Sequence, residues 1–449
     1  MNNPTVTLTT DTLQDNKESL EGGSKKYYGR CKVCGKLNTH KYWCVSCFAE
    51  RFKQQSVNWT SGNKEIDEFI LELQVNATNF YQFIEWIPYE KFSDVKYLSK
   101  GGYGEVFTAQ WDEGYICGWL DEYKDWYRDS NIKVVLKSLL NSKNMTKEFL
   151  RELQFQVRSY DSSLALGIIR CYGITRDAKS GNFMMVMDYG SDGSLRKYLD
   201  IRFNNLIWYK KLNILLDIIK GIRNIHRVGM THRDLHGGNI IVKRNYTYIT
   251  DFGLSKLVEE EFSKEKKKIF GVLPFVAPEV LCQSDYTKAA DIYSFGIIMN
   301  EMTTGIPPYN DVPHDGKLAF QIISGLRPKI NKDRTPQLIL DLIEQCWDKH
   351  PENRPTAETL HDIIEKMNVD CQVNYTQLYK QIQVINKFIK DQTKSNTTMS
   401  PIIYKTHPQA IYTSRLLLEN KTFVANPANP ADSSITGLIL PDDSDDESY

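Results

Sequence analysis

The chain has 449 residues, of which 41% are hydrophobic and 12% aromatic. This length exceeds the size at which one hydrophobic core stops growing, so we expect a large two-lobed unit with flanking modules. Basic and acidic side chains number 56 each, which excludes a global field that would draw the chain to nucleic acid or to an anionic membrane.

The amino-terminal residues 1–28 are polar and lack periodic apolar positions, so we expect them to be disordered. They carry no secretory pattern, and no later stretch approaches the roughly 18 uncharged apolar residues of a membrane span. Nine cysteines are too few for a disulfide framework in a chain of this length, which favours reduced thiols. We therefore expect a cytoplasmic protein, with access to the nucleus left open.

A compact cysteine block occupies 29–57, where Cys31-x2-Cys34 precedes Cys44-x2-Cys47. Two thiolate pairs on tight turns are the arrangement that tetrahedral Zn²⁺ requires. A unit of about thirty residues cannot bury a self-sustaining core without metal, so folding and zinc binding should coincide. The spacing predicts a structural zinc module, with unliganded thiols or a redox pair as alternatives.

A helical linker is predicted at 58–91. Its apolar positions recur at i, i+3, i+4 and i+7, and they are Ile66, Phe69, Ile70 and Leu73. Ser61 and Asn63 are candidate caps. This apolar face needs a partner surface, which we expect the next domain to supply.

Residues 92–370 begin with short β-branched runs and then become mainly helical. This change predicts a small sheet-rich lobe at 92–187 joined to a larger helical lobe at 191–370. The clearest elements are two buried strands and one helix, at 134–136, 183–187 and 212–222. Residues 371–449 are polar and irregular and end in an acidic block, which predicts a C-terminal extension with a solvated tail.

A glycine-rich hairpin is predicted at 98–107, where Gly101, Gly102 and Gly104 precede Val106. Glycines let backbone N–H groups approach phosphates without Cβ obstruction, although glycine hairpins usually only turn the chain. The G-x-G-x-x-G spacing is not met and no G-x-x-x-x-G-K-[ST] string occurs, which removes the main support for a Rossmann or P-loop interpretation.

Lys137 ends the apolar run at 134–136, where a buried ammonium needs an anionic partner. Nucleotide phosphates would be such a partner. Glu152, in the helical stretch 147–153, can orient this lysine through an ion pair. Taken singly, a lysine that snorkels from a strand end is the commoner case.

The string at 231–239 reads T-H-R-D-L-H-G-G-N, and D-F-G follows at 251–253. These residues resemble the H-R-D-x-x-x-x-N catalytic loop and the D-F-G motif of eukaryotic protein kinases, and 277–279 resembles the A-P-E that closes the activation segment. The resemblance extends from about 92 to 367. It implies the α+β, bilobal protein kinase fold and the transfer of the γ-phosphoryl group of Mg²⁺-bound ATP to a protein hydroxyl.

The resemblance also implies roles for individual residues. Asp234 would accept or steer the proton of the substrate hydroxyl. Asn239 and Asp251 would supply oxygen ligands to Mg²⁺, and Lys137, held by Glu152, would grip the α- and β-phosphates. In the glycine-rich hairpin, the resemblance places four residues over the ATP phosphates: Gly101, Gly102, Gly104 and Val106. It also makes Met187 the gatekeeper and places Asp188 and Tyr189 in the hinge that contacts the adenine.

Two further matches concern the scaffold of the site. Asp291 corresponds to the helical aspartate that braces the catalytic loop, and Arg354 to the arginine that pairs with Glu279. The strings at 291–296 and 346–355 resemble the tyrosine-kinase-like group, whose members mostly phosphorylate serine and threonine. The cysteine pairs ahead of a kinase resemble the preamble of a group of expanded fungal kinases.

The sequence departs from the family pattern at several positions. Serine/threonine kinases usually carry a lysine where this chain has His236 and a threonine where it has Val272, so tyrosine or dual specificity stays open. The missing lysine predicts slower turnover. Gln156 stands at a position that is usually apolar, and a buried amide there would need its own hydrogen bonds. Ser263, in a lysine-rich stretch, is a candidate regulatory phosphosite if Arg233 helps to bind its phosphate.

Two other functions compete with an active kinase. A pseudokinase scaffold would keep the fold for protein partners without catalysis, although every position needed for the chemistry holds a competent residue. A zinc-dependent nucleic-acid adaptor would rest on the cysteine block, and the neutral net charge argues against it. We expect protein substrates and ATP as partners and no nucleic acid, with the oligomeric state left open.

Overall fold

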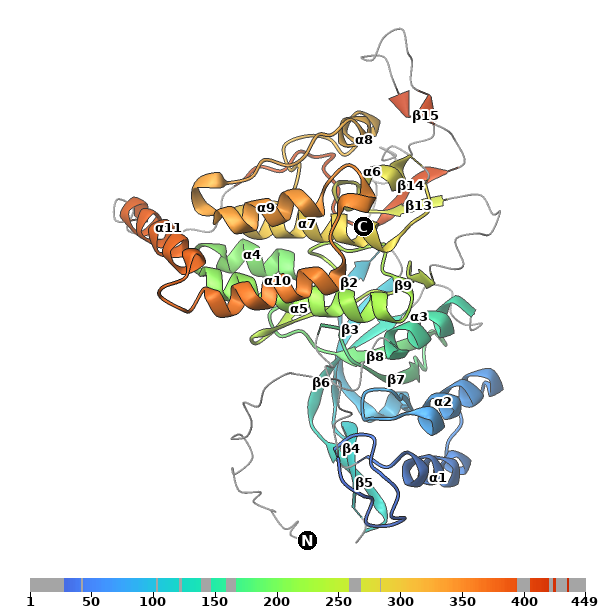
Figure 1. Ribbon diagram of the computed structural model, residues 1–449. Helices are drawn as coiled ribbons and strands as arrows, with labels where there is room; N and C mark the ends of the chain where they lie inside the picture. Colours follow the sequence, from blue (N-terminus) through green and yellow to red (C-terminus); the bar gives the residue numbers. More distant parts are fainter. Residues whose placement is uncertain are drawn as a thin grey trace.

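The computed structural model describes residues 28–41, 43–101, 104–120, 123–138, 147–158, 167–257, 268–282, 284–393, 404–419, 423–424 and 434–435. It has two lobes, a sheet-containing lobe formed mainly by the first part of the chain and a helical lobe formed by the rest (Figure 1). The predicted α+β, bilobal fold is confirmed.

The amino-terminal lobe is built on a six-stranded sheet in the order β1-β7-β8-β6-β3-β2. Its strands are β1 (Glu85–Trp86), β2 (Phe92–Gly101), β3 (Gly104–Trp111), β6 (Ile132–Ser138), β7 (Cys171–Arg176) and β8 (Phe183–Asp188). β1 runs parallel to β7, and the other neighbours are antiparallel. The strands predicted at 134–136 and 183–187 are confirmed, and alternate residues of β8 face two different apolar clusters.

The predicted linker packs against this lobe. It contains α2 (Lys64–Asn76), which begins after Asn63, and the Asn63 side chain accepts hydrogen bonds from the backbone N–H groups of Glu65 and Ile66. The side chains of Ile66 and Ile70 are fully buried against the lobe, as the periodicity predicted. The same segment also supplies β1, so the sheet begins ahead of residue 92.

The cysteine block shares its core with the sheet-containing lobe. Trp43 is buried just ahead of α1 (Val45–Gln55), and Phe48 and Phe52 are buried on this helix. The ring of Trp126 stacks on Phe52 with 4.7 Å between centroids. Trp126 belongs to β5 (Asp125–Asp129), which forms a hairpin with β4 (Tyr115–Leu120). Large aromatic side chains thus bury the cysteine block against this hairpin, and the coincidence of folding with zinc binding stays a prediction.

The carboxy-terminal lobe is mainly helical. Its helices are α4 (Leu195–Arg202), α5 (Trp208–Arg227), α6 (Pro278–Leu281), α7 (Lys288–Thr304), α8 (Gly316–Ile323), α9 (Gln337–Cys346), α10 (Ala357–Asp370) and α11 (Gln377–Thr393). Among its short strands, β9 (Met230–Thr231) pairs with β12 (Lys256–Leu257) and β10 (Ile240–Lys243) pairs with β11 (Tyr246–Ile249). The helix predicted at 212–222 lies within α5, which is buried along most of its length.

The C-terminal extension differs from the expected irregular tail. α11 buries Leu378, Ile382 and Ile385 because these side chains recur on one face of the helix. Further along the chain, β14 (Arg415–Glu419) pairs antiparallel with β13 (Lys268–Gly271) at the edge of the helical lobe (Figure 1). A last pair joins β15 (Phe423–Val424) to β16 (Ser434–Ile435). The acidic block and residues 1–27 lie outside the described residues.

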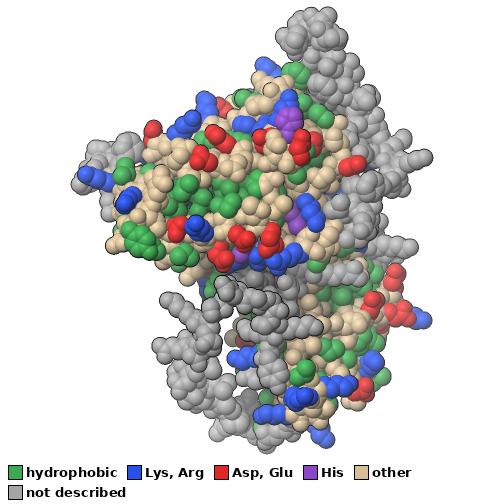
Figure 2. Space-filling view, viewed as in Figure 1, with side chains coloured by type: hydrophobic (Ala, Val, Ile, Leu, Met, Phe, Trp, Pro, Cys, Tyr) green, Lys and Arg blue, Asp and Glu red, His purple; other side chains and the backbone are tan. Residues whose placement is uncertain are grey.

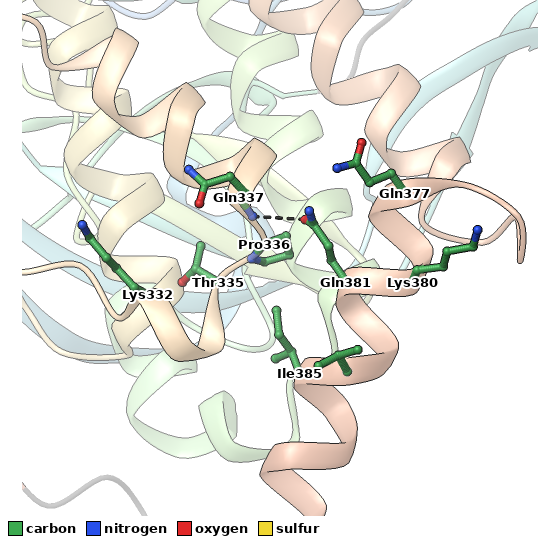
Figure 3. Close-up of a pocket in the computed structure, with 9 residues that line it drawn as sticks. Lys332, Thr335, Pro336, Gln337, Gln377, Lys380, Gln381 and Ile385 are labelled. Atoms are coloured by element: carbon green, nitrogen blue, oxygen red, sulfur yellow. Dashed lines mark hydrogen bonds between the residues drawn. The ribbon is translucent and has the colours of Figure 1, made fainter.

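Basic and acidic side chains are mixed over the face shown in Figure 2. Gln337 and Gln381 line a shallow pocket between α11 and the start of α9, where the backbone N–H of Gln337 donates to Oε1 of Gln381 at 3.1 Å (Figure 3). Within the described part of the chain, no helix combines the length and apolarity of a membrane span.

An ion pair joins α6 to the segment just ahead of α10. Nη1 and Nη2 of Arg354 lie 2.7 and 2.8 Å from the two carboxylate oxygens of Glu279, and the arginine side chain is 0% exposed. We predict that Arg354→Ala lowers the free energy of unfolding by about 3–5 kcal/mol, because it leaves a buried carboxylate without its charge partner. Urea unfolding of the full chain measures this loss.

The matched control is the exposed pair of Arg227 and Glu358, which has the same two-bond geometry. Its side chains are 45% and 51% exposed, so Arg227→Ala should cost less than about 1 kcal/mol. Equal losses in the two variants would contradict the assignment of a buried structural pair.

The burial of Lys211 on α5 should make the folding stability of the chain depend on pH. Its ammonium lies 4.1 Å from the ring centroid of Phe203, and burial together with nearby Arg334 lowers its pKa to about 7. Between pH 7 and the ordinary lysine pKa of 10.5, the unfolded chain binds more protons than the folded chain, so this residue makes stability rise with pH. Lys211→Met should raise the melting temperature at pH 7, and the gain should shrink toward pH 10.5. A gain that does not change with pH would contradict this origin.

Candidate active site

The catalytic loop at 232–239 is held in place by a buried carboxylate of α7. Asp291 accepts hydrogen bonds from the backbone N–H groups of His232 at 2.9 Å and Arg233 at 3.0 Å, and it lies 2.9 Å from Nε2 of His226. Burial opposes ionisation of Asp291, but its contact with His226 keeps its pKa below the usual range. The predicted brace is present, and it stabilises Arg233 in a left-handed conformation with φ of 74°.

Asp234 points its carboxylate into the site from this loop. Its side chain is buried, and the side-chain amide of Asn239 donates to Oδ2 and to the backbone carbonyl of Asp234, both at 3.0 Å. Burial favours the protonated acid, but the neighbouring His236 imidazole and a hydrogen bond from Ser414 lower the pKa of Asp234. Asp234 is therefore a charged hydrogen-bond acceptor. Because Asn239 donates through Nδ2, its carbonyl oxygen remains to bind a cation.

Lys137 connects the two lobes. Its ammonium lies 3.0 Å from Oε1 of Glu152 on α3 (Lys147–Arg158) and 2.9 Å from Oδ1 of Asp251. Burial lowers the pKa of Lys137, but the two carboxylates raise it more strongly, so the amine stays charged. Asp251 has a positive φ of 68°, which aims its side chain from the D-F-G turn toward this lysine.

The glycine-rich hairpin lies on the same sheet as Lys137. Gly101 is paired with Gly104 at its tip, and Val106 is directly opposite Lys137 in the β3–β6 register. The structure thus brings the hairpin and the lysine together. Gly102 lies outside the described residues.

The predicted hinge follows β8. The carboxylate of Asp188 accepts hydrogen bonds from Nζ of Lys243 at 2.7 and 2.6 Å and from the backbone N–H of Tyr189 at 2.9 Å. Nζ of Lys133 lies 4.2 Å from the ring centroid of Tyr189. These contacts tie the hinge to strands of both lobes.

His236 follows Asp234 by two residues in the same loop. Its Nδ1 accepts a hydrogen bond from the backbone N–H of Gly238 at 3.1 Å, so the neutral ring carries its proton on Nε2. Nε2 lies 3.8 Å from Oδ1 of Asp234. The imidazole therefore places a donor beside the carboxylate of Asp234.

Sequence reasoning missed one residue of the site. Ser414, from the C-terminal extension, donates from Oγ to Oδ2 of Asp234 at 2.5 Å and lies 3.3 Å from Nε2 of His236. The available signal was the apolar run 416–418 inside an otherwise polar tail. Ser263, the candidate phosphosite, lies outside the described residues.

Gln156 has the hydrogen bond that its burial requires. The side chain is 1% exposed, and Nε2 donates to the carbonyl oxygen of Ile169 at 2.7 Å. α3 therefore keeps its register, with Glu152 facing Lys137.

The four cysteines of the amino-terminal block converge. Their sulfur atoms lie within 4.8 Å of one another, with Cys31 3.7 Å from Cys47 and Cys34 3.5 Å from Cys44. A backbone hydrogen bond from Lys36 lowers the pKa of Cys34 to about 7, whereas burial raises the pKa values of Cys44 and Cys47. Four sulfur donors in this arrangement suit a tetrahedral Zn²⁺ ion.

Comparisons with known proteins agree with this geometry. A family model for protein tyrosine and serine/threonine kinases matches residues 92–364. The chain is 27% identical over 311 residues to gdt2, a probable serine/threonine-protein kinase of Dictyostelium discoideum, which aligns 68% of this chain with 17% of that protein. It is 26% identical over 321 residues to the serine/threonine-protein kinase STY17 of Arabidopsis thaliana, covering 70% of this chain and 51% of the relative.

A tyrosine kinase is among the similar proteins as well. The chain is 26% identical over 305 residues to the tyrosine-protein kinase Src64B of Drosophila melanogaster, covering 65% of this chain and 49% of the relative. The chain thus spans about half or less of the length of these curated relatives. Because the family model covers more than half of the chain, this protein belongs to the protein tyrosine and serine/threonine kinase family.

Proposed function

We propose that this chain transfers the γ-phosphoryl group of Mg²⁺-bound ATP to serine or threonine hydroxyls of protein substrates. The observation that carries the proposal is the contact network of the site, in which Lys137 joins Glu152 to Asp251 while Asn239 holds Asp234. Phosphoryl transfer depends on positioning and on neutralising phosphate charge, and these residue types supply both.

Each residue has a defined task in this proposal. Lys137 binds the α- and β-phosphates, and Glu152 keeps its ammonium in position. Asn239 and Asp251 offer the amide and carboxylate oxygens that Mg²⁺ prefers. When bound, the ion neutralises charge on the phosphates. Asp234 accepts the hydrogen bond of the attacking hydroxyl, which its ionised state and its burial allow.

Acceptor choice is proposed from two observations. Two of the relatives described above are named as serine/threonine kinases, and the strings at 291–296 and 346–355 resemble the tyrosine-kinase-like group. His236 supplies a hydrogen-bond donor in place of the usual lysine, but not its permanent charge, so we expect slow turnover. We also propose a cytoplasmic location for the protein.

The replacement of one carboxylate tests the proposal. Asp234→Asn should lower kcat for a serine- and threonine-containing peptide library about 10²–10⁴-fold, because the amide accepts a proton poorly. Radiolabelled ATP with Mg²⁺ provides the measurement and reports acceptor preference. Asp341→Asn, an exposed site on α9, is the matched control and should keep full activity.

Two outcomes would contradict this function. A wild-type chain that binds Mg²⁺-ATP but transfers no phosphate would favour the pseudokinase scaffold. Equal activities of wild type and Asp234→Asn would show that Asp234 is not the residue that handles the proton.

We also propose that Cys31, Cys34, Cys44 and Cys47 bind one structural Zn²⁺ ion. The convergence of their sulfur atoms within 4.8 Å supports this assignment. Neutral thiols would leave four weak donors facing one another, whereas Zn²⁺ binds them as thiolates. The ion would fix the turn at 31–35 against the start of α1.

Metal analysis of the purified full chain checks this assignment. We predict one zinc per chain, and Cys34→Ser together with Cys47→Ser should abolish it and lower the melting temperature. Cys282→Ser, which replaces an exposed cysteine outside the block, should leave the zinc content unchanged. A wild-type chain that purifies without zinc and does not bind added Zn²⁺ would refute the site.

A further inference from the structure

The C-terminal segment 404–419, here called the C-terminal strap, lies across the helical lobe and reaches the catalytic loop. Its contacts are specific, and they are made by side chains as well as by the backbone. Hydrogen bonds of 2.7–3.1 Å join Tyr404 to Asp200, Lys405 and His407 to Asn310, Gln409 and Ile411 to His314, Tyr412 to Pro308, and Arg415 to His314. The strap is therefore a docked segment of the fold.

The end of the strap adds a strand to the activation segment, the stretch between D-F-G and A-P-E. β14 pairs antiparallel with β13, with Gly271 opposite Arg415 and Phe270 opposite Leu416. Leu417 is 1% exposed and belongs to the core of the helical lobe. Addition of an extended peptide to an exposed strand edge is a general mode of peptide recognition, in which the backbone gives affinity and side-chain pockets give register.

This register delivers a hydroxyl to the catalytic aspartate. Ser414 immediately precedes β14, and its Oγ donates to Oδ2 of Asp234 at 2.5 Å. Nε2 of His236 lies 3.3 Å from the same Oγ, so the hydroxyl can donate to the carboxylate and accept from the imidazole. A base that receives a proton must lie within hydrogen-bond reach of the hydroxyl, and Asp234 does.

We infer that Ser414 is an intramolecular phosphorylation site, for which the C-terminal strap occupies the protein-substrate groove of its own chain. This inference rests on the proposed function and names one substrate of that same site. The phosphoryl donor is a nucleoside triphosphate bound with Mg²⁺ by the same chain. Until Ser414 is modified, the strap also competes with external substrates for Asp234 and β13.

The phosphoryl transfer to Ser414 forms one bond and breaks one. A bond forms between Oγ of Ser414 and the γ-phosphorus, and the bond from that phosphorus to the β–γ bridging oxygen breaks. The electron pair of the broken bond leaves on the nucleoside diphosphate. The hydroxyl proton passes to Oδ2 of Asp234 and then to solvent, and no atom changes its oxidation state.

The product should weaken the docking of the strap. Phosphoserine carries close to two negative charges at pH 7 and has no hydroxyl to donate, so its phosphate faces the ionised Asp234 without a hydrogen bond. Repulsion between these anions favours the release of residues near 414. External peptides then gain access, and their KM should fall after Ser414 is phosphorylated.

The test starts with dephosphorylated full-length protein, Mg²⁺-ATP and mass spectrometry of the peptide that contains position 414. We expect phosphate on Ser414, and its rate constant should stay the same over a hundredfold range of protein concentration. Ser414→Thr should give phosphothreonine at this position, and Ser414→Ala should give none. Thr413→Ala removes the neighbouring exposed hydroxyl and should leave the phosphate at 414 in place.

The outcomes separate this inference from the proposed function. Transfer to the external peptide library with Ser414 unmodified would overturn the inference and leave the proposed function intact. No transfer to either acceptor would overturn both. If active chains phosphorylate Ser414 of Asp234→Asn chains at a rate that rises with concentration, the reaction is intermolecular and the inference of an internal substrate fails.

Discussion

The organisation of this molecule depends on one buried cation. Lys137 is almost inaccessible to solvent, so its charge requires nearby anions, and the two lobes supply one carboxylate each. Glu152 comes from α3 of the sheet-containing lobe, and Asp251 comes from the D-F-G turn of the helical lobe. The ion pairs therefore hold the two lobes together at this point, and we propose that the same charge binds nucleotide phosphates between them.

The catalytic loop depends on a second buried charge of opposite sign. Asp291 receives backbone N–H groups from two successive residues, and it holds Arg233 in a conformation that an isolated chain would rarely adopt. Asp234 follows directly, so the direction of its carboxylate is determined by α7 as much as by its own loop. α7, more than fifty residues away in the sequence, thus positions Asp234, which we propose accepts the proton of the substrate hydroxyl.

Much of this arrangement could be predicted from the sequence, because the motifs encode local chemistry. The brace by Asp291, the pair of Arg354 with Glu279 and the pair of Lys137 with Glu152 all follow from motif positions, and the contacts are present. The apolar spacing of Ile66 and Ile70 was enough to predict an amphipathic helix. Contacts between segments without motifs were not predictable, since short polar stretches carry little periodicity.

The cysteine block and the C-terminal strap illustrate this limit. The four cysteines indicated a metal site, but no sequence signature marked the packing of Trp43 on Phe80 and Phe83, or that of Phe52 on Trp126 of the β4–β5 hairpin. Ser414 lies in a tail that composition describes as solvated, and only its docking along 308–314 brings it to Asp234. The overall composition of the tail is polar, so it does not indicate the few residues that contact the helical lobe.

The participation of β1 and α2 in the sheet-containing lobe has a consequence for where the kinase unit begins. Sequence similarity to the family starts at residue 92, but β7 has β1 as its neighbour and the apolar cluster around Ile169 and Met185 is covered by Ile66 and Ile70. A polypeptide cut at the homology boundary would carry an open strand edge beside a bare apolar patch, two features that promote self-association. For this protein, α2 and β1 belong to the packed sheet-containing lobe although they lie ahead of the residues that the family model matches.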